Sequence, residues 1–427
     1  MKQTWLTVQE GNCFIHLLRN HKFKMVSVLA QVEIPLAKET VTKTALLPQL
    51  LLRATKSYPD TMQLTRAFDS LYGTNMSAYV TKNGNLQTLE WVMRVPGASY
   101  LPNGHDVLEK ALTLFMEVMM DPYQEDRGFA KQYVQTELTL HKQRIENSIN
   151  DKGAYAAKRC QEIMFEGQPY GLSKQGFLED VDRLTADALF AHHHALMQEN
   201  ALHFYLVGPI DEQATVTMLT SILANYAWRK NNVEQHPLSH PQARQARSLY
   251  VNERFEVNQA KLNLGYFSGV HYEDDDYEAI QVANGILGGF PHSKLFVNVR
   301  EKESLAYSAF SRYDGLNGTL LIHAGIDEQV YPKARSIIEA QIDDLQQGKI
   351  TDDELLFTQD ALIHRYRLAD DQPLTQAGFH HYYRLTGRER STDDLIEGVR
   401  HVTKADVQRV AQSFAQDTIY LLQGKGD

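Results

Sequence analysis

The chain has 427 residues, of which 43% are hydrophobic, and its formal net charge is −10. This length predicts two or more domains. The acidic balance argues against nucleic acid or an anionic membrane as the main partner. No apolar run reaches the roughly 18 residues of a transmembrane helix, so no such helix is predicted.

The N-terminus and the cysteines point to one compartment. The first ten residues contain no apolar core of the kind found in secretory signal peptides. Cys13 and Cys160 are the only cysteines, and although they could pair, two unclustered residues are more typical of free thiols in a reducing environment. We therefore expect a cytoplasmic protein.

Four segments have the alternation or the continuous apolar character of β-strands. They are residues 25–32 and 89–95 in the first half, and residues 262–267 and 319–324 in the second. Helix signals lie between the strand-like segments. Strands that are segregated from paired helices predict an α+β fold rather than strict alternation.

Three helices are indicated by the residues at their starts. Asp106 with Glu109 has the pattern of a capping box, and Thr351 with Glu354 has the same pattern later in the chain. Pro332 suits the first turn of another helix. The apolar faces are formed by Leu112, Phe115 and Met119 after Asp106, and by Ile338, Ile342 and Leu345 after Pro332.

The two halves of the chain resemble each other. Residues 181–187 are similar to 399–405, so that Thr185 corresponds to Thr403, and Gly208 corresponds to Gly424 at nearly the same offset. A period of this length is far beyond the roughly 20–50 residues of a solenoid repeat and predicts a duplicated domain.

A polar stretch without apolar periodicity separates the halves and is predicted to be a linker. We therefore expect a first domain at residues 1–228, the linker at 229–247 and a second domain at 248–427.

Two neighbouring segments carry a family resemblance. Residues 288–296 read Gly-Gly-Phe-Pro-His-Ser-Lys-Leu-Phe, and residues 300–308 read Arg-Glu-Lys-Glu-Ser-Leu-Ala-Tyr-Ser. Together they resemble the second-domain signature of the insulinase/pitrilysin-like (M16) zinc peptidases. Residues 39–48, 58–59 and 71–73 are similar to a narrower group, the YmfF type of Gram-positive bacteria. The resemblance implies two M16 modules, each a mainly antiparallel sheet packed with helices, that form a half-clam.

The zinc motif of that family, His-x-x-Glu-His, is missing. Ligands at this spacing converge on one face of a helix. None of the 17 histidines has the required neighbours. His236 and His240 come closest, but Ser239 stands where Glu is needed and Pro237 breaks the helix.

Aligned on the family pattern, Ala45, Pro48 and Gln49 occupy the three motif positions. Arg144 occupies the position of the third zinc ligand, and Glu137 is its retained acidic neighbour. Ala and Pro have no side-chain donor, and Gln is a poor zinc ligand. The resemblance therefore implies that this chain binds no cofactor, and we interpret the segment around Pro48 as an apolar helix with a proline kink.

The second-domain signature keeps the residues that act on substrate in the family. The resemblance implies that Arg300 and Tyr307 reach the substrate backbone and the carbonyl under attack. A guanidinium can fix a carbonyl, and a phenol can stabilise an oxyanion; the alternative role is maintenance of the fold. Gly288-Gly289 is either a helix C-cap or a flexible substrate-contacting loop, as in the zinc-free subunit of the mitochondrial processing peptidase.

Other polar clusters have simpler interpretations. Consecutive histidines at 192–194 on a helix face different directions, which disfavours a shared metal. The aromatic and histidine residues 380–383 are expected to pack rather than to line a cavity. The acidic run 273–276 is interpreted as charge at a helix N-terminus, favoured by the macrodipole, rather than as a calcium site.

These observations predict a non-catalytic M16 subunit that binds an extended peptide as an added strand. A zinc-bearing, YmfH-like M16 partner would supply the zinc and the water-activating Glu for peptide or precursor processing. One alternative is a structural or binding module, like the inactive M16 core subunits of respiratory complexes. Another is a self-sufficient peptidase, although no Ser/His/Asp or Cys/His context supports it. A homodimer of the isolated chain stays open.

Overall fold

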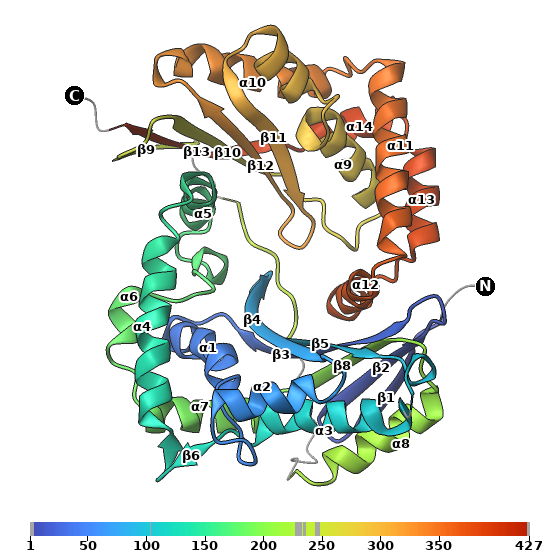
Figure 1. The fold of residues 1–427 in the computed structure, drawn as a ribbon. Helices are drawn as coiled ribbons and strands as arrows, with labels where there is room; N and C mark the ends of the chain where they lie inside the picture. Colours follow the sequence, from blue (N-terminus) through green and yellow to red (C-terminus); the bar gives the residue numbers. More distant parts are fainter. Residues whose placement is uncertain (1–3, 103, 227–232, 234–235, 244–247, 425–427) are drawn as a thin grey trace. The chain divides into compact units, whose positions relative to one another are not determined.

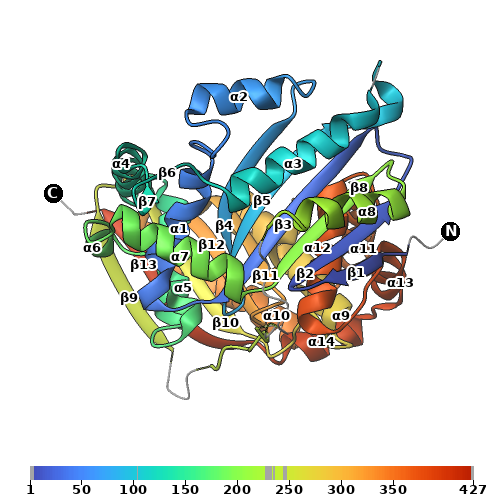
Figure 2. The ribbon, with the colours of Figure 1, turned by 90° about the horizontal axis from the view of Figure 1, so that it is seen from below.

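The computed structural model describes residues 4–102, 104–226, 233, 236–243 and 248–424. The chain divides into two compact units. The first comprises Met1–Glu146, Leu172–Pro237 and Gln372–Gly378, and the second comprises Asn147–Gly171, Leu238–Asp371 and Phe379–Asp427. Each unit combines one main β-sheet with helices (Figures 1 and 2), which confirms the predicted α+β class.

The sheet of the first unit has the strand order β1-β2-β8-β3-β5-β4. Its centre is β3 (Met25–Pro35), which is buried along nearly its whole length between antiparallel partners β5 (Leu86–Pro96) and β8 (Leu202–Gly208). Both strand segments predicted in this half lie in β3 and β5. The other strands are β1 (Leu6–Glu10), β2 (Cys13–Arg19) and β4 (Asn75–Asn83), with a small hairpin of β6 (Gln124–Glu125) and β7 (Gly128–Phe129).

Helices pack on one face of this sheet around a core that contains Trp91, Phe115 and Phe204 (Figure 1). The helices are α1 (Lys38–Leu51), α2 (Thr61–Asp69), α3 (Val107–Met120), α4 (Lys131–Asn147), α6 (Leu178–Val181), α7 (Ala186–Glu199) and α8 (Glu212–Leu223). Helix α3 buries the predicted apolar positions Leu112, Phe115 and Met119. Among the described helices, none combines the length and apolar character needed to cross a bilayer.

The capping box predicted at the start of α3 is wrong. Asp106 makes no side-chain cap hydrogen bond, and its carboxylate instead pairs with Lys110 at 2.6 Å. The reason is the backbone: Asp106 ends the 3₁₀ turn Gly104–Asp106 with φ −108° and ψ 1°, whereas a capping residue needs an extended conformation.

The sheet of the second unit has the order β11-β12-β10-β13-β9. Its strands are β9 (Leu249–Phe255), β10 (Ala260–Phe267), β11 (Ala306–Asp314), β12 (Thr319–Ile326) and β13 (Ala415–Gly424). The two predicted strands of this half are β10 and β12. Its helices are α9 (Tyr277–Asn284), α10 (Tyr331–Gln346), α11 (Asp352–Ala369), α13 (Thr392–His401) and α14 (Lys404–Ala411), with most of α12 (Pro373–Thr386).

The helix starts predicted in this half are confirmed. Pro332 lies in the first turn of α10, and Thr351 with Glu354 forms a complete capping box on α11.

The topology confirms the predicted duplication. Strands β2, β8, β3, β5 and β4 of the first unit correspond in order to β9, β13, β10, β12 and β11 of the second. The directions agree as well, since β2/β8 and β9/β13 are parallel pairs and the other neighbouring pairs are antiparallel. The matched segments also correspond, because Thr185 and Thr403 cap α7 and α14.

The units are not continuous in sequence, unlike the predicted domains 1–228 and 248–427. Helix α5 (Lys152–Met164) precedes the predicted linker but packs on β10 and β13 of the second unit. Its contacts there are made by Ala156, Cys160 and Met164 against Phe267, Tyr420 and Leu422. Conversely, the start of α12 places Leu374 and Ala377 against Leu18, Leu29 and Tyr205 of the first unit.

Only part of the predicted linker 229–247 is described. Residues 233 and 236–243 form no helix or strand, and the rest of the linker lies outside the described residues. Cys13 and Cys160 are both buried and free, as predicted. Burial raises the pKa of both thiols, so neither is a reactive thiolate at neutral pH.

Candidate functional site

Helix α1 carries the three positions that align with the zinc motif. Ala45 and Pro48 are buried in the helix, and Pro48 lies within it as predicted. The amide of Gln49 donates a hydrogen bond to the carbonyl oxygen of Ala78 on β4 at 2.6 Å. Two positions thus lack a donor atom, and the third side chain ties α1 to the sheet.

Glu137 on α4 lies between two arginines. Its side chain is 2% exposed. Arg53, just after α1, donates from Nε to Glu137 Oε1 at 2.8 Å and from Nη2 to the same oxygen. Arg144, two turns along α4, donates from Nη2 to Glu137 Oε2 at 3.0 Å. We call Arg53, Glu137 and Arg144 the ion triad.

The ion triad does not fit a zinc site. Two guanidiniums beside one carboxylate leave a local excess of positive charge, which opposes a divalent cation. The nearby His141 is buried, and its Nε2 lies 2.8 Å from the carbonyl oxygen of Gln175. Burial lowers the pKa of His141. Among the described residues, no group of three or more His, Cys, Asp or Glu side chains is arranged to hold a metal.

The consecutive histidines of α7 have three separate partners, as predicted for residues that face different directions. His192 Nε2 lies 2.8 Å from the hydroxyl of Thr44, and His193 Nε2 lies 2.8 Å from the carbonyl oxygen of Met119. His194 Nε2 lies 2.9 Å from the amide of Gln198. These side chains are part of the packing of α7.

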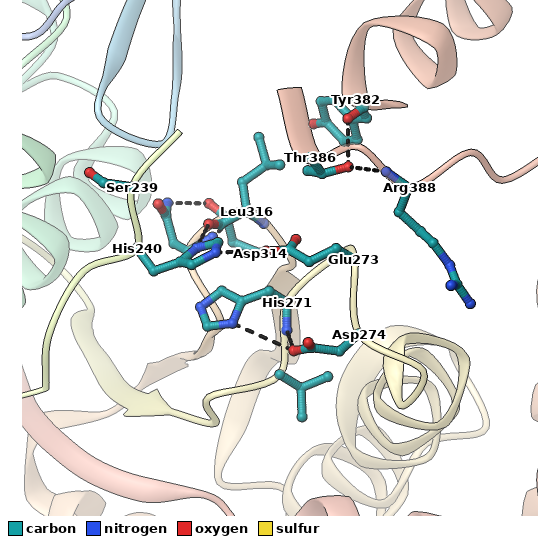
Figure 3. Close-up of polar contacts among 12 residues, drawn as sticks. Ser239, His240, His271, Glu273, Asp274, Asp314, Leu316, Tyr382, Thr386 and Arg388 are labelled. Carbon is teal, nitrogen blue, oxygen red and sulfur yellow. Dashed lines mark hydrogen bonds and ion pairs between the residues drawn. The ribbon is translucent and has the colours of Figure 1, made fainter. Parts of the chain in front are cut away.

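The acidic run 273–276 is engaged with basic and imidazole side chains rather than open to calcium. Figure 3 shows its first two members beside a pair of histidines whose ring centroids are 3.7 Å apart. The run ends at Asp276, the residue directly before α9, so it lies at a helix N-terminus as predicted, although Asp276 makes no side-chain cap hydrogen bond. The pairs are Glu273 with His240, Asp274 with His271, Asp275 with Arg388 and Asp276 with Arg409.

Residues 380–383 lie on α12 and pack as expected. The ring of Tyr382 meets Tyr272 edge-on at 5.4 Å, and His381 Nδ1 lies 3.2 Å from Arg384 Nη2. Burial lowers the pKa of His380 to about 4, so it is neutral at physiological pH. These rings form part of the second unit's interior, with Tyr383 at the surface.

The Arg300 segment has an unusual helical form. Residues Gly285–Gly289 and Phe296–Lys302 are both π-helical, a form that is often found at functional sites. Arg300 is exposed, and its guanidinium carbon lies 4.5 Å from the centre of the Phe296 ring. The charged end of Arg300 thus stacks on this ring, while the residue as a whole remains exposed.

Gly288 and Gly289 are the last two residues of a helical run whose C-cap is Phe290, so they form its final turn rather than the predicted C-cap or a separate loop. Gly288 is buried against β11, where an added Cβ would collide with the backbone and the hydroxyl oxygen of Ser311. Glycine is therefore required for close packing at Gly288. A substrate-binding role for either glycine stays a prediction.

Tyr307 projects from a β-bulge on the edge strand β11. The register with β12 shifts between Ala306 and Ser308, so that Tyr307 has no residue opposite it. Its side chain is 79% exposed. Bulges at sheet edges commonly redirect a side chain near a functional site.

A hydrogen bond and an uncommon backbone conformation define the segment that precedes Tyr307. The backbone N–H of Leu305 donates to the carbonyl oxygen of Val299 at 3.1 Å, which joins the Arg300 segment to the start of β11. Ser304 between them adopts φ 51°, an uncommon conformation for a residue other than glycine. Such local strain is typical of functional segments. The structure thus holds both predicted residues on ordered elements with exposed side chains.

Comparison with known proteins gives a consistent assignment. A family model described as "Peptidase M16 inactive domain" matches residues 183–362. A protein of Bacillus subtilis (strain 168) named "Probable inactive metalloprotease YmfF" is 34% identical over 98% of this chain and 97% of its own length. The chain belongs to the M16 peptidase family.

Other relatives extend this M16 assignment. The crystal structure of a conserved protein from Enterococcus faecalis V583 is 28% identical, with a TM-score of 0.92 over 99% of both chains. AlbE of Bacillus subtilis (strain 168), named for biosynthesis of the antilisterial bacteriocin subtilosin, is 25% identical over 74% of this chain and 76% of its own. This chain is thus an M16-like protein in which the described residues at the motif positions are not zinc ligands.

Proposed function

We propose that this chain is a non-catalytic M16 subunit that binds an extended peptide and provides Arg300 and Tyr307 to a zinc-bearing M16 partner. The observation that carries the proposal is a contrast within one chain. The zinc positions are occupied by Ala45, Pro48, Gln49 and Arg144, whereas Arg300 and Tyr307 are exposed on elements shaped by π-helical turns and a bulge.

The open edge of β11 suits an extended peptide. It is the last strand of its sheet, and within the described residues no strand pairs with its outer side. Beyond the bulge, β11 pairs regularly with β12 from Ser308 to Asp314. A peptide added along this edge would bond through its backbone, which gives tolerance of sequence, and one end would lie beside Tyr307.

Arg300 and Tyr307 have the chemistry that a partner's zinc site needs. The guanidinium offers donors in a fixed fork to a peptide carbonyl. The phenol offers one donor to an oxyanion that forms when the carbonyl is attacked. The partner would supply the metal and the base, so this chain would act on the reaction only within the complex.

The comparisons favour a role in peptide maturation. The YmfF relative is named a probable inactive metalloprotease, and the AlbE relative is named for the biosynthesis of a bacteriocin. A peptide or precursor is therefore the proposed substrate class for the complex.

Turnover by the mixed complex tests the trans role. The chain is purified with a candidate zinc-bearing homologue, and cleavage of a fluorogenic peptide is measured. We expect Arg300→Ala and Tyr307→Phe each to lower kcat on the order of 10²–10³-fold, the usual effect of removing one oxyanion donor. Zinc content and complex assembly should not change.

Lys302→Ala is the matched control, because Lys302 is an exposed cation in the same π-helical segment and bonds Asn298 at 3.0 Å. It should be nearly silent. If Arg300→Ala and Tyr307→Phe also leave turnover at the wild-type level, the pair is structural and the chain is better described as a scaffold. Cleavage by the chain alone would instead favour a self-sufficient peptidase.

Zinc content tests the inactive site. We expect the purified chain to carry no stoichiometric zinc, because Ala45, Pro48, Gln49 and Arg144 replace the expected ligands and base. Elemental analysis after dialysis against zinc is the measurement. One zinc per chain that is lost on Gln49→Ala would contradict the proposal.

Backbone-modified peptides test strand addition without changing the protein. Peptides that bind the chain, measured by fluorescence anisotropy, are N-methylated at one position at a time. Alternate positions of an added strand point their N–H groups at the edge, so we expect binding to be lost at every second position only. Uniform tolerance of methylation would exclude recognition through a strand backbone.

A further inference from the structure

We propose that the outer edge of β9 is a self-association surface, through which two copies of this chain join their second-unit sheets into one continuous sheet. Strand β9 (Leu249–Phe255) is the last strand of its sheet at the end opposite β11 (Figure 1). Within the described residues, no strand pairs with its outer side. The proposal concerns a different edge from the peptide site and does not depend on it.

The duplication indicates that the outer edge of a strand at the position of β9 is normally paired with another strand. Strand β9 is the counterpart of β2, because each pairs in parallel with the last strand of its own unit and in the same register. In the first unit β1 covers β2, with pairs from Leu6↔Leu17 to Glu10↔Cys13. By the shared register, residues 249–253 occupy the positions that β1 covers on β2.

The exposure of β9 agrees with an edge that no described strand covers. Leu249 is 37% exposed and Tyr250 is 46% exposed, and Asn252 and Arg254 are exposed as well. In β2, by contrast, most side chains are buried. A long exposed strand edge with apolar residues is a liability that proteins usually cover by pairing it.

The inner side of β9 is firmly anchored, so the edge is presented by a rigid strand. Glu253 accepts hydrogen bonds from Tyr155 Oη at 3.1 Å, from Tyr420 Oη at 2.8 Å and from Arg159 Nη2 at 2.9 Å. These contacts join β9 to α5 and β13 within the second unit. A preordered strand pays little conformational entropy when it pairs.

The sequence of β9 is complementary to itself. A twofold axis perpendicular to the sheet keeps each side chain on its own face, so only residues of the same parity can lie opposite each other. The antiparallel register with Asn252 on the axis uses the whole strand. It places Leu249 opposite Phe255, Tyr250 opposite Arg254 and Val251 opposite Glu253.

The neighbouring registers are worse. If the twofold axis passed through Glu253, two carboxylates would lie opposite each other. If it passed through Val251, Arg254 and Phe255 would have no residue of the second β9 strand opposite them. The Asn252 register instead gives an apolar pair and an arginine–tyrosine contact on each side of the axis, both of which stabilise neighbouring strands. This self-complementarity is why we assign a second copy of the chain, rather than a different protein, as the occupant.

Charge placement tests both the surface and the register. Light scattering after size exclusion, over a series of protein concentrations, should show a dimer of the wild-type chain. Tyr250→Lys puts like charges opposite Arg254 at two symmetric places, and should raise the dimer Kd on the order of tenfold. Adding Arg254→Glu to Tyr250→Lys makes those pairs opposite in charge and should restore the dimer.

A cross-link locates the axis independently. Asn252→Cys should give a covalent dimer under mild oxidation, because opposite Cβ atoms in an antiparallel pair are about 4.5–5.5 Å apart, near the reach of a disulfide. Lys302→Cys, also exposed but distant from β9 in the sequence and on another element, is the control and should stay monomeric on the gel. The buried Cys13 and Cys160 should contribute no background.

Each outcome decides the proposal. A wild-type chain that stays monomeric throughout the concentration series overturns it. So does a dimer that survives Tyr250→Lys with unchanged Kd and forms no Asn252→Cys cross-link, since another surface then holds the copies together. Circular dichroism of each variant separates loss of pairing from loss of fold. If the dimer forms as expected while Tyr307→Phe has no effect on peptide turnover, the proposed function fails and this inference stands.

Discussion

Glu137, which the family resemblance places as the acidic neighbour of the third ligand position, lies between two arginines. Its carboxylate is buried and bound by Arg53 and Arg144, which lie about one-third exposed. Alignment alone located Glu137 and Arg144. It did not locate Arg53, because the contact between the end of α1 and the middle of α4 joins residues 84 positions apart.

Removing this carboxylate should be costly. Glu137→Gln leaves two guanidiniums without their counter-charge, and breaking a buried ion pair in this way typically costs about 3–5 kcal/mol. The partial exposure of both arginines places the expected loss near about 3 kcal/mol. Urea denaturation measures the free energy of unfolding.

The control lies on the same helix. Lys142 pairs with Asp182, whose side chain is 75% exposed, so Asp182→Asn should change stability by less than about 1 kcal/mol. Equal effects of the two substitutions would mean that the ion triad does not stabilise the remodelled site.

At the scale of single elements, two helix starts show how far a short sequence pattern can predict a capping box. The same Ser/Thr/Asp-x-x-Glu spacing gave a complete capping box at Thr351 and none at Asp106. The difference lies in the preceding backbone, which is extended at Thr351 and folded into a 3₁₀ turn at Asp106. A four-residue pattern carries no information about that turn.

The capping difference is measurable. Thr351→Ala should destabilise the protein by about 1 kcal/mol, because it removes the acceptor for the backbone N–H of Glu354 at 3.1 Å. Asp106→Ala should have a clearly smaller effect, since Asp106 makes no side-chain cap hydrogen bond to α3. Thermal unfolding of both variants gives the comparison, and a larger loss for Asp106→Ala would contradict it.

The bulge at Tyr307 is a second local feature that the sequence pattern did not predict. The signature residues predicted an exposed, functional Tyr307, but the alternation of β11 gave no sign of the extra residue. Only the pairing with β12 reveals the shift between Ala306 and Ser308. The four predicted strand segments do not include β11, so neither this strand nor the orientation of Tyr307 was predicted from the apolar pattern.

At the scale of the whole molecule, buried histidines make both units sensitive to acid. Burial lowers the pKa of His192 and His193 in the first unit to about 4. Burial also lowers the pKa of His323 and His380 in the second unit to about 4. In the unfolded chain a histidine titrates near pH 6.5. Between these values the unfolded state binds more protons, so stability falls as the pH drops from about 6.5 to 4.

The contribution of one histidine can be isolated. His193→Gln should lower stability at pH 7.5 but reduce its decline between pH 6.5 and 4, where a shift of this size is worth up to about 3 kcal/mol. His194→Gln, which removes the exposed neighbouring imidazole on α7, is the matched control. Urea denaturation at several pH values decides this, and an unchanged slope for His193→Gln would refute the assignment.

The duplicated topology could be predicted from two short similarities, because corresponding strands and helix caps keep their local sequence. The placement of α5 and of the start of α12 could not be predicted, because it depends on contacts with residues distant in sequence, such as Cys160 with Tyr420 and Ala377 with Tyr205.

Because α5 and residues 372–378 each belong to a unit formed mainly by the other half of the chain, each unit contains segments that are synthesised far apart in time. Helix α5 leaves the ribosome long before β10 and β13, against which Cys160 and Met164 pack, and β13 is the last strand of the chain. The first unit likewise waits for residues 372–378. Neither unit can therefore complete its core as soon as its first segments are synthesised, and the apolar face of α5 stays uncovered until β13 has been made.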